Sequence, residues 1–318
     1  MAADGVRTRR PHLQAEPALA SGLPLGLDLV AERRVLTDDQ LRASAPRASR
    51  RSSEASLLYG IDPGTRQPLN LDRFALSNPN AVVLGDPDAR RRLLSLELAR
   101  TRLTGRHAHL IAAEKGYQRV VEAFDGRMPA PLAFDPFSLA GREDNLEARI
   151  EALVAVIELM IPGLMPAAAS AVEDAIAFTY AAHGYSCDSN DEDLIPPTLD
   201  EIRTALLRRG ARITESTRAV IDGLAGALER YTAGTGRRLL KLRKQAFPLD
   251  PLSLHDLAGL SEQDQPIAEF LSLDRVWRSV PDGRRSLITL DDAHLAVTGQ
   301  AGQHISRLMA GAAEHGWV

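Results

Sequence analysis

Short apolar segments that alternate with helical segments restrict the fold of this chain more than any other feature. The first of them, Asn80–Leu84, is rich in valine, has the length of a buried strand, and is bounded by Pro79 and Gly85. Strands are expected at 80–84, 107–112 and 131–134, with helices between them at 87–104 and 117–124. This strand–helix–strand–helix–strand order predicts a parallel sheet covered by helices, the α/β class.

The middle of the chain has a different, all-helical pattern. From Leu146 to Ile161, apolar residues recur at spacings of three and four, as on the buried face of a helix. Thr198 and Glu201 have the spacing of a capping box, in which each side chain bonds the backbone N–H of the other at the start of a helix. We therefore predict an all-helical insertion over 143–235.

The strand pattern returns after the insertion. Strands are expected at Leu252–Asp256 and Ser286–Leu290, with a helix over 267–280 between them and a last helix over about 301–314. The chain should therefore return to the same sheet after the helical insertion.

The N-terminal part is unlike the rest. Residues 1–55 contain scattered proline, alanine and arginine with little periodicity, and are expected to be partly disordered and to end in a linker. Next, the segments 57–60 and 67–71 flank Asp62–Thr65, whose Pro-Gly sequence is typical of a turn. These segments predict a β-hairpin in front of the first sheet strand.

Composition limits the class of protein. Apolar residues make up 44% and charged residues 25%, as in soluble globular proteins. The sequence has no apolar run of the ~20 residues that a membrane span needs, and its basic N-terminus lacks the apolar core of a signal peptide. The single cysteine, Cys187, excludes an internal disulfide and a cysteine-based zinc site. We expect a cytoplasmic protein.

Two carboxylates, Asp291 and Asp292, directly follow the apolar strand at 286–290. An apolar strand that ends in this way is the Walker B pattern of nucleotide-hydrolysing α/β proteins. In such a site Asp291 would hold Mg²⁺, an ion that prefers oxygen ligands, and Asp292 would orient the attacking water. The alternative interpretation is a buried strand that ends in a polar turn.

A phosphate-binding loop should accompany this pattern, and the best-placed segment is Gly85–Arg92. Such a loop needs two glycines, a lysine and a hydroxyl residue at fixed spacing. Gly85 fits, but Arg90, Arg91 and Arg92 stand at the second glycine, the lysine and the Mg²⁺-binding hydroxyl. A side chain at the second glycine hinders close approach of the backbone to phosphate, and arginine lacks the compact head group of lysine. These four positions form a degenerate phosphate loop.

The same segment has the composition of an ordinary helix start. Asp86 is a preferred N-cap residue, Pro87 suits the first helical position, and Asp88 complements the helix dipole. We therefore expect a side-chain cap where a phosphate would otherwise bind.

Taken in order, these segments resemble the motor domain of the conjugative-transfer and type IV secretion ATPases, of the TraC and VirB type within the HerA/FtsK superfamily. The resemblance covers about 57–318 and rests on an ordered set of segments: Tyr59–Pro68, Leu71–Gly85, His109–Tyr117, the helical insertion, Leu254–Leu260 and Asp291–Asp292. The family usually has Asp-Pro at Ala112–Ala113 and Asp-Glu at Asp291–Asp292. More faintly, Leu23–Gly26 resembles the end of the family's N-terminal domain.

The resemblance implies a RecA-like P-loop NTPase sheet with an all-helical insertion. It assigns 1–55 to the remnant of an N-terminal domain and a linker, 56–142 and 236–318 to the two parts of the motor domain, and 143–235 to the insertion. In the family, another strand follows the last helix and lies between the Walker A and Walker B strands. The sequence stops at Val318 before such a strand, so we expect a sheet that is incomplete at its C-terminus.

Family members are hexameric motors that use ATP and Mg²⁺ to power export of DNA or protein. Because the phosphate loop is degenerate, we expect a non-catalytic or very weakly nucleotide-binding relative, with other secretion subunits or a downstream polypeptide that supplies the missing strand as partners. The expected location is the cytoplasm, including the inner face of the membrane. One alternative is an active ATPase that uses Arg91 in place of the lysine. Another is a DNA-binding module that uses the five cations of Arg237–Lys244.

Overall fold

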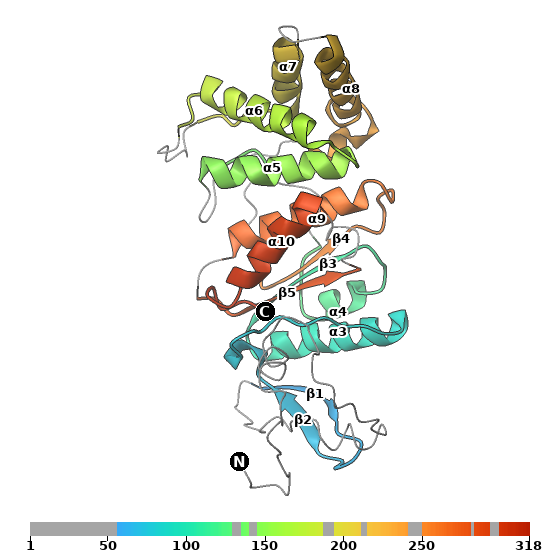
Figure 1. Ribbon diagram of the computed structural model, residues 1–318. Helices are drawn as coiled ribbons and strands as arrows, with labels where there is room; N and C mark the ends of the chain where they lie inside the picture. The colour runs from blue at the N-terminus through green and yellow to red at the C-terminus, as the bar shows by residue number, and fades with distance from the viewer. Residues whose placement is uncertain are drawn as a thin grey trace, which may run out of the picture. The chain divides into compact units, whose positions relative to one another are not determined.

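Figure 1 shows the computed structural model, which describes residues 56–128, 135–139, 145–186, 194–210, 215–240, 250–280, 283–292 and 299–318. All of these residues belong to one compact unit, Ser52–Val318. The predictions for 1–55 and for a strand at 131–134 lie outside the described residues.

Three parallel strands form the sheet in the described part of the chain, and each lies where the sequence predicts a strand. They are β3 (His107–Ala112), β4 (Leu252–Asp256) and β5 (Ser286–Asp291). The central strand is β3, and its Ile111 lies opposite His255 on β4 and Leu290 on β5. Because the strands are parallel, their carboxyl ends meet at one edge of the sheet, where Asp256 and Asp291 lie.

The segment Asn80–Leu84 is not a strand, and here the prediction is wrong. An apolar run forms a sheet strand only beside another strand, and among the described residues no strand pairs with it. As a result, the side chains of Val82 and Leu84 are 80% and 88% exposed. The Asn80 side chain instead donates a hydrogen bond of 2.9 Å to the carbonyl of Met309.

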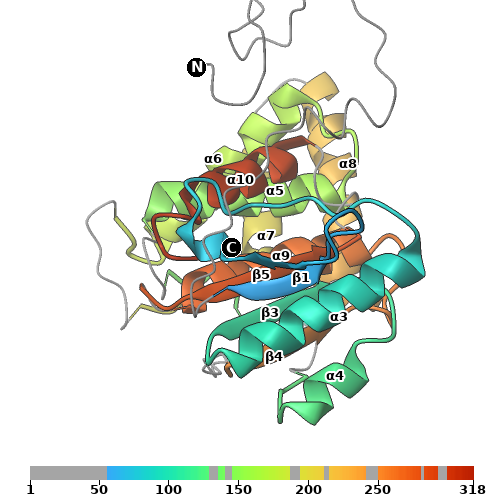
Figure 2. The ribbon, with the colours of Figure 1, turned by 90° about the horizontal axis from the view of Figure 1, so that it is seen from below.

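Helices cover both faces of the sheet (Figure 2). They are α3 (Pro87–Leu103), α4 (Gln118–Ala123), α9 (Gln265–Ser279) and α10 (Gly299–Gly311). On one face, Leu94 and Leu98 of α3 share a buried cluster with Ala108 and Leu110 of β3. On the other face, Ile111 belongs to a larger cluster that includes residues of α9 and α10. β3 is buried on both faces, as strands of parallel sheets usually are, and its fully buried side chains are apolar except for His109, whose Nδ1 lies 2.8 Å from Oγ of Ser253.

The predicted hairpin is present and contacts α3. Its strands are β1 (Leu57–Ile61) and β2 (Pro68–Leu71), and a short 3₁₀ helix, η1 (Arg73–Ala75), follows. The carboxylate of Asp62 accepts hydrogen bonds from the backbone of Gly64 and Thr65, both at 2.9 Å, and so closes the turn. Arg73 forms a 2.6 Å ion pair with the buried Glu97 of α3, which also accepts a hydrogen bond from Tyr59.

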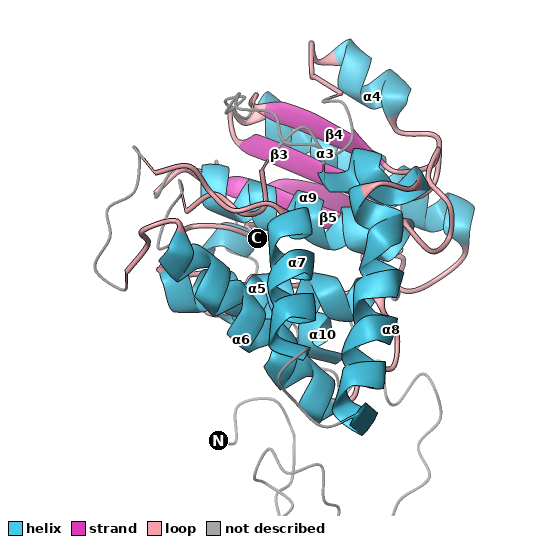
Figure 3. Cartoon of the chain, turned by 90° about the horizontal axis from the view of Figure 1, so that it is seen from above, coloured by secondary structure: helices cyan, strands magenta, loops and turns pink. Residues whose placement is uncertain are grey.

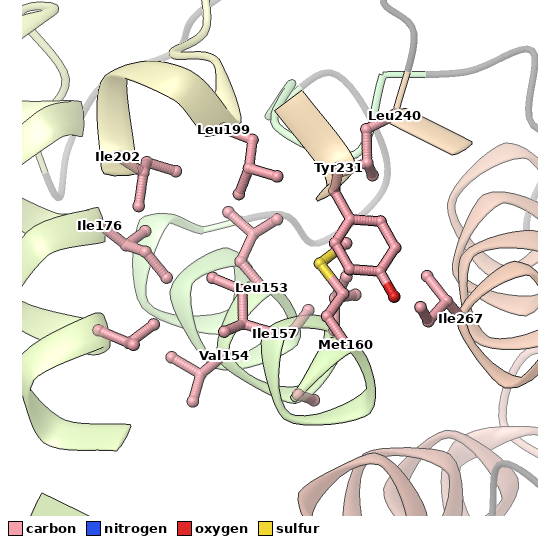
Figure 4. Close-up of a cluster of buried hydrophobic side chains, with 14 of the residues drawn as sticks. Leu153, Val154, Ile157, Met160, Ile176, Leu199, Ile202, Tyr231, Leu240 and Ile267 are labelled. Atoms are coloured by element: carbon pink, nitrogen blue, oxygen red, sulfur yellow. The ribbon is translucent and has the colours of Figure 1, made fainter. Parts of the chain in front are cut away.

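The described part of the middle region is helical. It comprises α5 (Leu146–Met160), α6 (Pro166–Ala182), α7 (Leu199–Gly210), α8 (Glu215–Thr232) and the 3₁₀ segment η2 (Thr235–Leu240). Figure 3 shows these helices from above and Figure 4 shows their shared core, in which Leu153 and Ile157 of α5 lie near Ile202 and Tyr231. The predicted capping box is confirmed, since the Thr198 N–H donates to Glu201 at 2.8 Å and the Glu201 N–H donates back at 3.3 Å.

Candidate nucleotide site

The last residue of β5, Asp291, lies at the carboxyl edge of the sheet on the face covered by α3. Its side chain is only 5% exposed. The Tyr117 hydroxyl donates a hydrogen bond of 2.8 Å to Oδ2 of Asp291, and Nη2 of Arg90 lies 4.0 Å from Oδ1. Burial, followed by this hydrogen bond, raises the pKa of Tyr117, which therefore remains a donor at neutral pH. The carboxylate at the predicted Mg²⁺ position is thus already bonded within the chain.

The next residue, Asp292, ends the strand with a backbone φ of +69°. Aspartate tolerates this left-handed conformation better than most residues. Asp292 and Asp291 both lie near Glu269 of α9, which is 3% exposed. Burial above all, and then the charges of Asp292 and Asp291, raise the pKa of Glu269 to about 8. Glu269 is therefore mostly protonated at neutral pH, and its Oε1 has no hydrogen-bond partner among the residues that the structure describes.

The segment predicted as a degenerate phosphate loop forms the start of α3. Gly85, with φ at +150°, leads into Asp86, whose Oδ1 accepts hydrogen bonds from the backbone N–H groups of Asp88 (3.0 Å) and Ala89 (3.2 Å). The predicted N-cap is therefore confirmed. Pro87, the first residue of the helix, has no N–H to offer. Amide groups that could bind an anion at this helix end are occupied by a side chain of the chain itself.

The three arginines at the degenerate positions point to different places. Arg90 approaches Asp291, whereas Arg91 forms ion pairs with Asp88 at 3.0 Å and with Glu114 at 2.6 Å. The hydrogen bond that Arg91 donates to Glu114 raises the pKa of Arg91, so this cation stays charged and paired. Arg92 is exposed, and its side chain makes no ion pair or hydrogen bond with the residues that the structure describes.

The aliphatic part of the Arg91 side chain packs against the backbone of Gly116, which follows β3. A Cβ atom at Gly116 would lie 2.8 Å from Cδ of Arg91, and the φ of this glycine is +128°. Only glycine allows both this contact and this conformation. The close approach fixes the path of the Arg91 side chain toward Glu114.

Sequence reasoning missed four residues of this edge: Glu114, Tyr117, Gln118 and Glu269. The first three follow β3, so their position at a strand's carboxyl end was a usable signal. The Gln118 amide donates a 2.8 Å hydrogen bond to Asp256, at the end of β4. Glu269 was detectable as a carboxylate among the apolar residues of α9.

Neither a metal site nor a nucleic-acid site can be built from the described residues. Within the described ranges, no group of three His, Cys, Asp or Glu side chains could hold a metal ion. Of the basic run 237–244, residues 241–244 lie outside the described residues, while Arg237 is exposed in η2. No helix in the described part of the chain is long and apolar enough to cross a membrane.

Comparison with known proteins identifies the fold. No protein-family model and no curated protein matches the sequence. Among solved structures, VirB4 of Thermoanaerobacter pseudethanolicus matches with a TM-score of 0.71, over 84% of this chain and 76% of that one. The chain has the VirB4 fold. At 18% sequence identity, this match confirms the predicted resemblance at the level of the fold.

Proposed function

We propose that this chain is a VirB4-like component of a type IV secretion or conjugal transfer apparatus that binds nucleotide very weakly or not at all. The VirB4 fold supports the assignment to this apparatus. The structure at the start of α3 supports the lack of nucleotide binding. The observation that carries it is the pair of hydrogen bonds from Asp88 and Ala89 to the Asp86 carboxylate. A phosphate would have to displace this carboxylate, which repels it.

Electrostatics around the site support the same proposal. Two arginines face the edge, but Arg91 is paired with Asp88 and Glu114, and Arg90 approaches Asp291. The acidic residues nearby are more numerous: Asp86, Asp88, Glu114, Asp256, Asp291 and Asp292. A triphosphate carries several negative charges and needs unpaired cations or free N–H groups. The residues present therefore do not fit an ATP–Mg²⁺ complex, and we derive no hydrolytic step.

The proposed partners are other subunits of the secretion apparatus. The proposed location is the cytoplasm, including the inner face of the membrane. The RecA-like assignment of the sheet and the boundaries 1–55, 56–142, 143–235 and 236–318 belong to this proposal, as does the role of 143–235 as an insertion.

Titration of the chain with a fluorescent ATP analogue in the presence of Mg²⁺ tests the proposal. We expect no saturable binding at micromolar concentrations. Micromolar, Mg²⁺-dependent binding that Asp291→Ala abolishes would contradict it. A variant that restores the loop pattern, Arg90→Gly with Arg91→Lys and Arg92→Thr, is a matched comparison. We expect it to bind only when Asp86 is also replaced, since the carboxylate cap remains otherwise.

The retained pair Asp291–Asp292 at the end of β5 favours a second candidate, a working ATPase with Arg91 at the lysine position. Its prediction is phosphate release that Asp292→Asn reduces. The ion pairs of Arg91 argue against it, because a lysine substitute should be free to reach phosphate. Equal phosphate release by the original protein and by Asp292→Asn would reject this candidate.

A further inference from the structure

Basic side chains gather at the amino edge of the sheet, where β3 and β5 begin, opposite the edge that carries Asp291. His107 is the first residue of β3 and lies opposite Ser286 of β5. The His107 N–H donates a hydrogen bond of 3.1 Å to the Arg285 carbonyl. Continued by one residue toward the amino ends, this register places Arg106 opposite Arg285. Like charges in such a position repel each other.

A third arginine, Arg284, bonds the His107 ring. Arg284 is exposed, and its Nη1 lies 2.9 Å from Nε2 of His107. A guanidinium group can only donate, so Nε2 accepts and the imidazole is neutral. Burial first, and then the charges of Arg284 and Arg102, lower the pKa of His107, so the ring stays neutral at pH 7. Two guanidinium groups therefore lie near a ring that carries no charge.

The basic residues of this edge are called the amino-edge cluster: Arg102, Arg106, His107, Arg284 and Arg285. Among the described residues, the ion pair of this cluster joins Arg106 to Asp72 at 3.4 Å. Arg102 donates to the Arg106 carbonyl, and Nε of Arg102 and Nη1 of Arg106 are buried without a hydrogen-bond partner in the described part of the chain. Within that part, four guanidinium groups thus share one carboxylate.

Ordinary structural roles account for only some of these charges. Arg102 lies in the last turn of α3, where a cation complements the negative end of the helix dipole. Arg284 and Arg285 precede a strand and have no such role. At the amino end of β4, the carboxylate of Asp250 is paired with Arg127 at 3.1 Å. Positive charge therefore remains unbalanced at the exposed side of the cluster.

The charge and shape of these groups indicate a type of ligand. One carboxylate would balance a single guanidinium, whereas a phosphate monoester carries about two negative charges and three acceptor oxygens. The planar donors of arginine match phosphate oxygens. Arg284 and Arg285 are exposed, so a group in solution can reach them.

We propose that the amino-edge cluster binds a phosphate monoester group, with Arg284 and Arg102, which both lie near His107, as the main ligands and Arg285 as additional charge. Free phosphate and the headgroup of phosphatidic acid share this chemistry. The site lies at the opposite edge of the sheet from Asp291, so it is separate from the candidate nucleotide site and goes beyond the proposed function.

Titration of the whole 318-residue chain with inorganic phosphate, followed by NMR at constant ionic strength, tests the proposal. We expect saturable shifts of the backbone amide signals of His107 and Ser286, with a Kd of about 1 mM or below. Chloride should give no saturable shift. Bound phosphate should also raise the pKa of His107, because it offsets the neighbouring guanidinium charges.

Vesicle sedimentation distinguishes the two sources of the group. If the ligand is a lipid headgroup, vesicles of phosphatidylcholine with phosphatidic acid should bind the chain, and inorganic phosphate should compete. If the ligand is free phosphate, the chain should bind phosphate but not these vesicles. Phosphatidylglycerol, a diester with one charge, should bind more weakly than phosphatidic acid.

A double variant, Arg284→Gln with Arg285→Gln, is the main test on the protein side. Both side chains are exposed, so the fold should tolerate the change, while phosphate binding should weaken by about tenfold or more. Arg208→Gln with Arg218→Gln is the matched control, because it removes the same charge from exposed positions on α7 and α8. It should leave phosphate binding unchanged.

Three results would overturn the proposal. The first is the absence of saturable binding to both phosphate and vesicles. The second is undiminished binding by the Arg284 and Arg285 variant, and the third is an equal loss in the control, which would indicate general attraction by net charge. An ATP analogue held at this cluster would bind independently of Asp291→Ala, so the result is distinguishable from that of the nucleotide titration.

Discussion

Ionisable side chains are buried both at the helical region and at the carboxyl edge of the sheet, but only the first are paired with an opposite charge. Between α5 and α9, Arg149 and Asp274 are 4% and 5% exposed and form a two-fold hydrogen-bonded ion pair at 3.0 and 3.2 Å. At the sheet edge, Glu269 is equally buried, and the charges of described residues that shift its pKa are those of two carboxylates, Asp291 and Asp292. The first arrangement stabilises the fold, whereas the second is a cost that the fold tolerates.

The Arg149–Asp274 pair and Glu269 therefore differ in how their buried polar groups are satisfied. A buried pair with satisfied hydrogen bonds holds two helices in register. A buried carboxyl group whose pKa is raised by burial and by neighbouring carboxylates is a type of group often found at binding or catalytic positions. Glu269 therefore differs from Arg149 and Asp274, whose opposite charges are paired with each other.

Breaking the ion pair should give the largest effect. Asp274→Ala removes the carboxylate that pairs with the buried guanidinium of Arg149 and also lies 3.7 Å from that of Arg278, so the free energy of unfolding should fall by about 3–5 kcal/mol. Urea denaturation measures this change. Glu151→Ala is the control, because the Glu151–Arg307 pair is exposed and should contribute less than about 1 kcal/mol. Equal losses in the two variants would remove the contrast between buried and exposed pairs.

The pH dependence of the free energy of unfolding tests the burial of Glu269 at the sheet edge. Folded Glu269 keeps its proton up to a pKa of about 8, whereas the ordinary value is 4.5. Between these values the folded state binds one proton more than the unfolded state, so the free energy of unfolding falls as pH rises, by up to about 1.4 kcal/mol per pH unit.

Glu269→Gln stays neutral and should lack this decline. The measurement is urea denaturation of both proteins from pH 5 to 8, and the difference between them should widen toward pH 8. Parallel profiles would mean that Glu269 titrates normally and that the sheet edge carries no such cost.

The smallest effect is expected at the start of α3. Asp86→Ala removes the acceptor for two backbone N–H groups and should cost about 1 kcal/mol. Asp86→Ser keeps a capping oxygen without the charge and should be close to the original protein. Thermal unfolding compares the three proteins, and an unchanged melting temperature in Asp86→Ala would contradict the role of the cap.

Local patterns predicted most of the fold. The three sheet strands, the hairpin and the capping box at Thr198 follow from short-range spacing, and the structure has them at or within a residue of the expected positions. Asn80–Leu84 failed because a strand also needs a neighbour, which its own sequence does not encode. Hydrogen bonds and ion pairs between residues far apart in the sequence could not be predicted for a similar reason.

In the site, the sequence located Asp291 and the Asp86 cap but not what surrounds them. Tyr117 and Asp291 are 174 residues apart, and their hydrogen bond depends on how β3 and β5 pair. The separate directions of Arg90 and Arg91 were also out of reach, because they depend on where Glu114 and Asp291 lie in space.

The Asp86 cap also limits how this chain could change over evolutionary time. Replacing Arg91 with lysine alone would leave the carboxylate on the helix amides, and replacing Asp86 alone would lower stability without creating a phosphate loop. Each single step toward nucleotide binding is therefore neutral or harmful until several coincide. A self-capped helix start of this kind is therefore preserved against single substitutions.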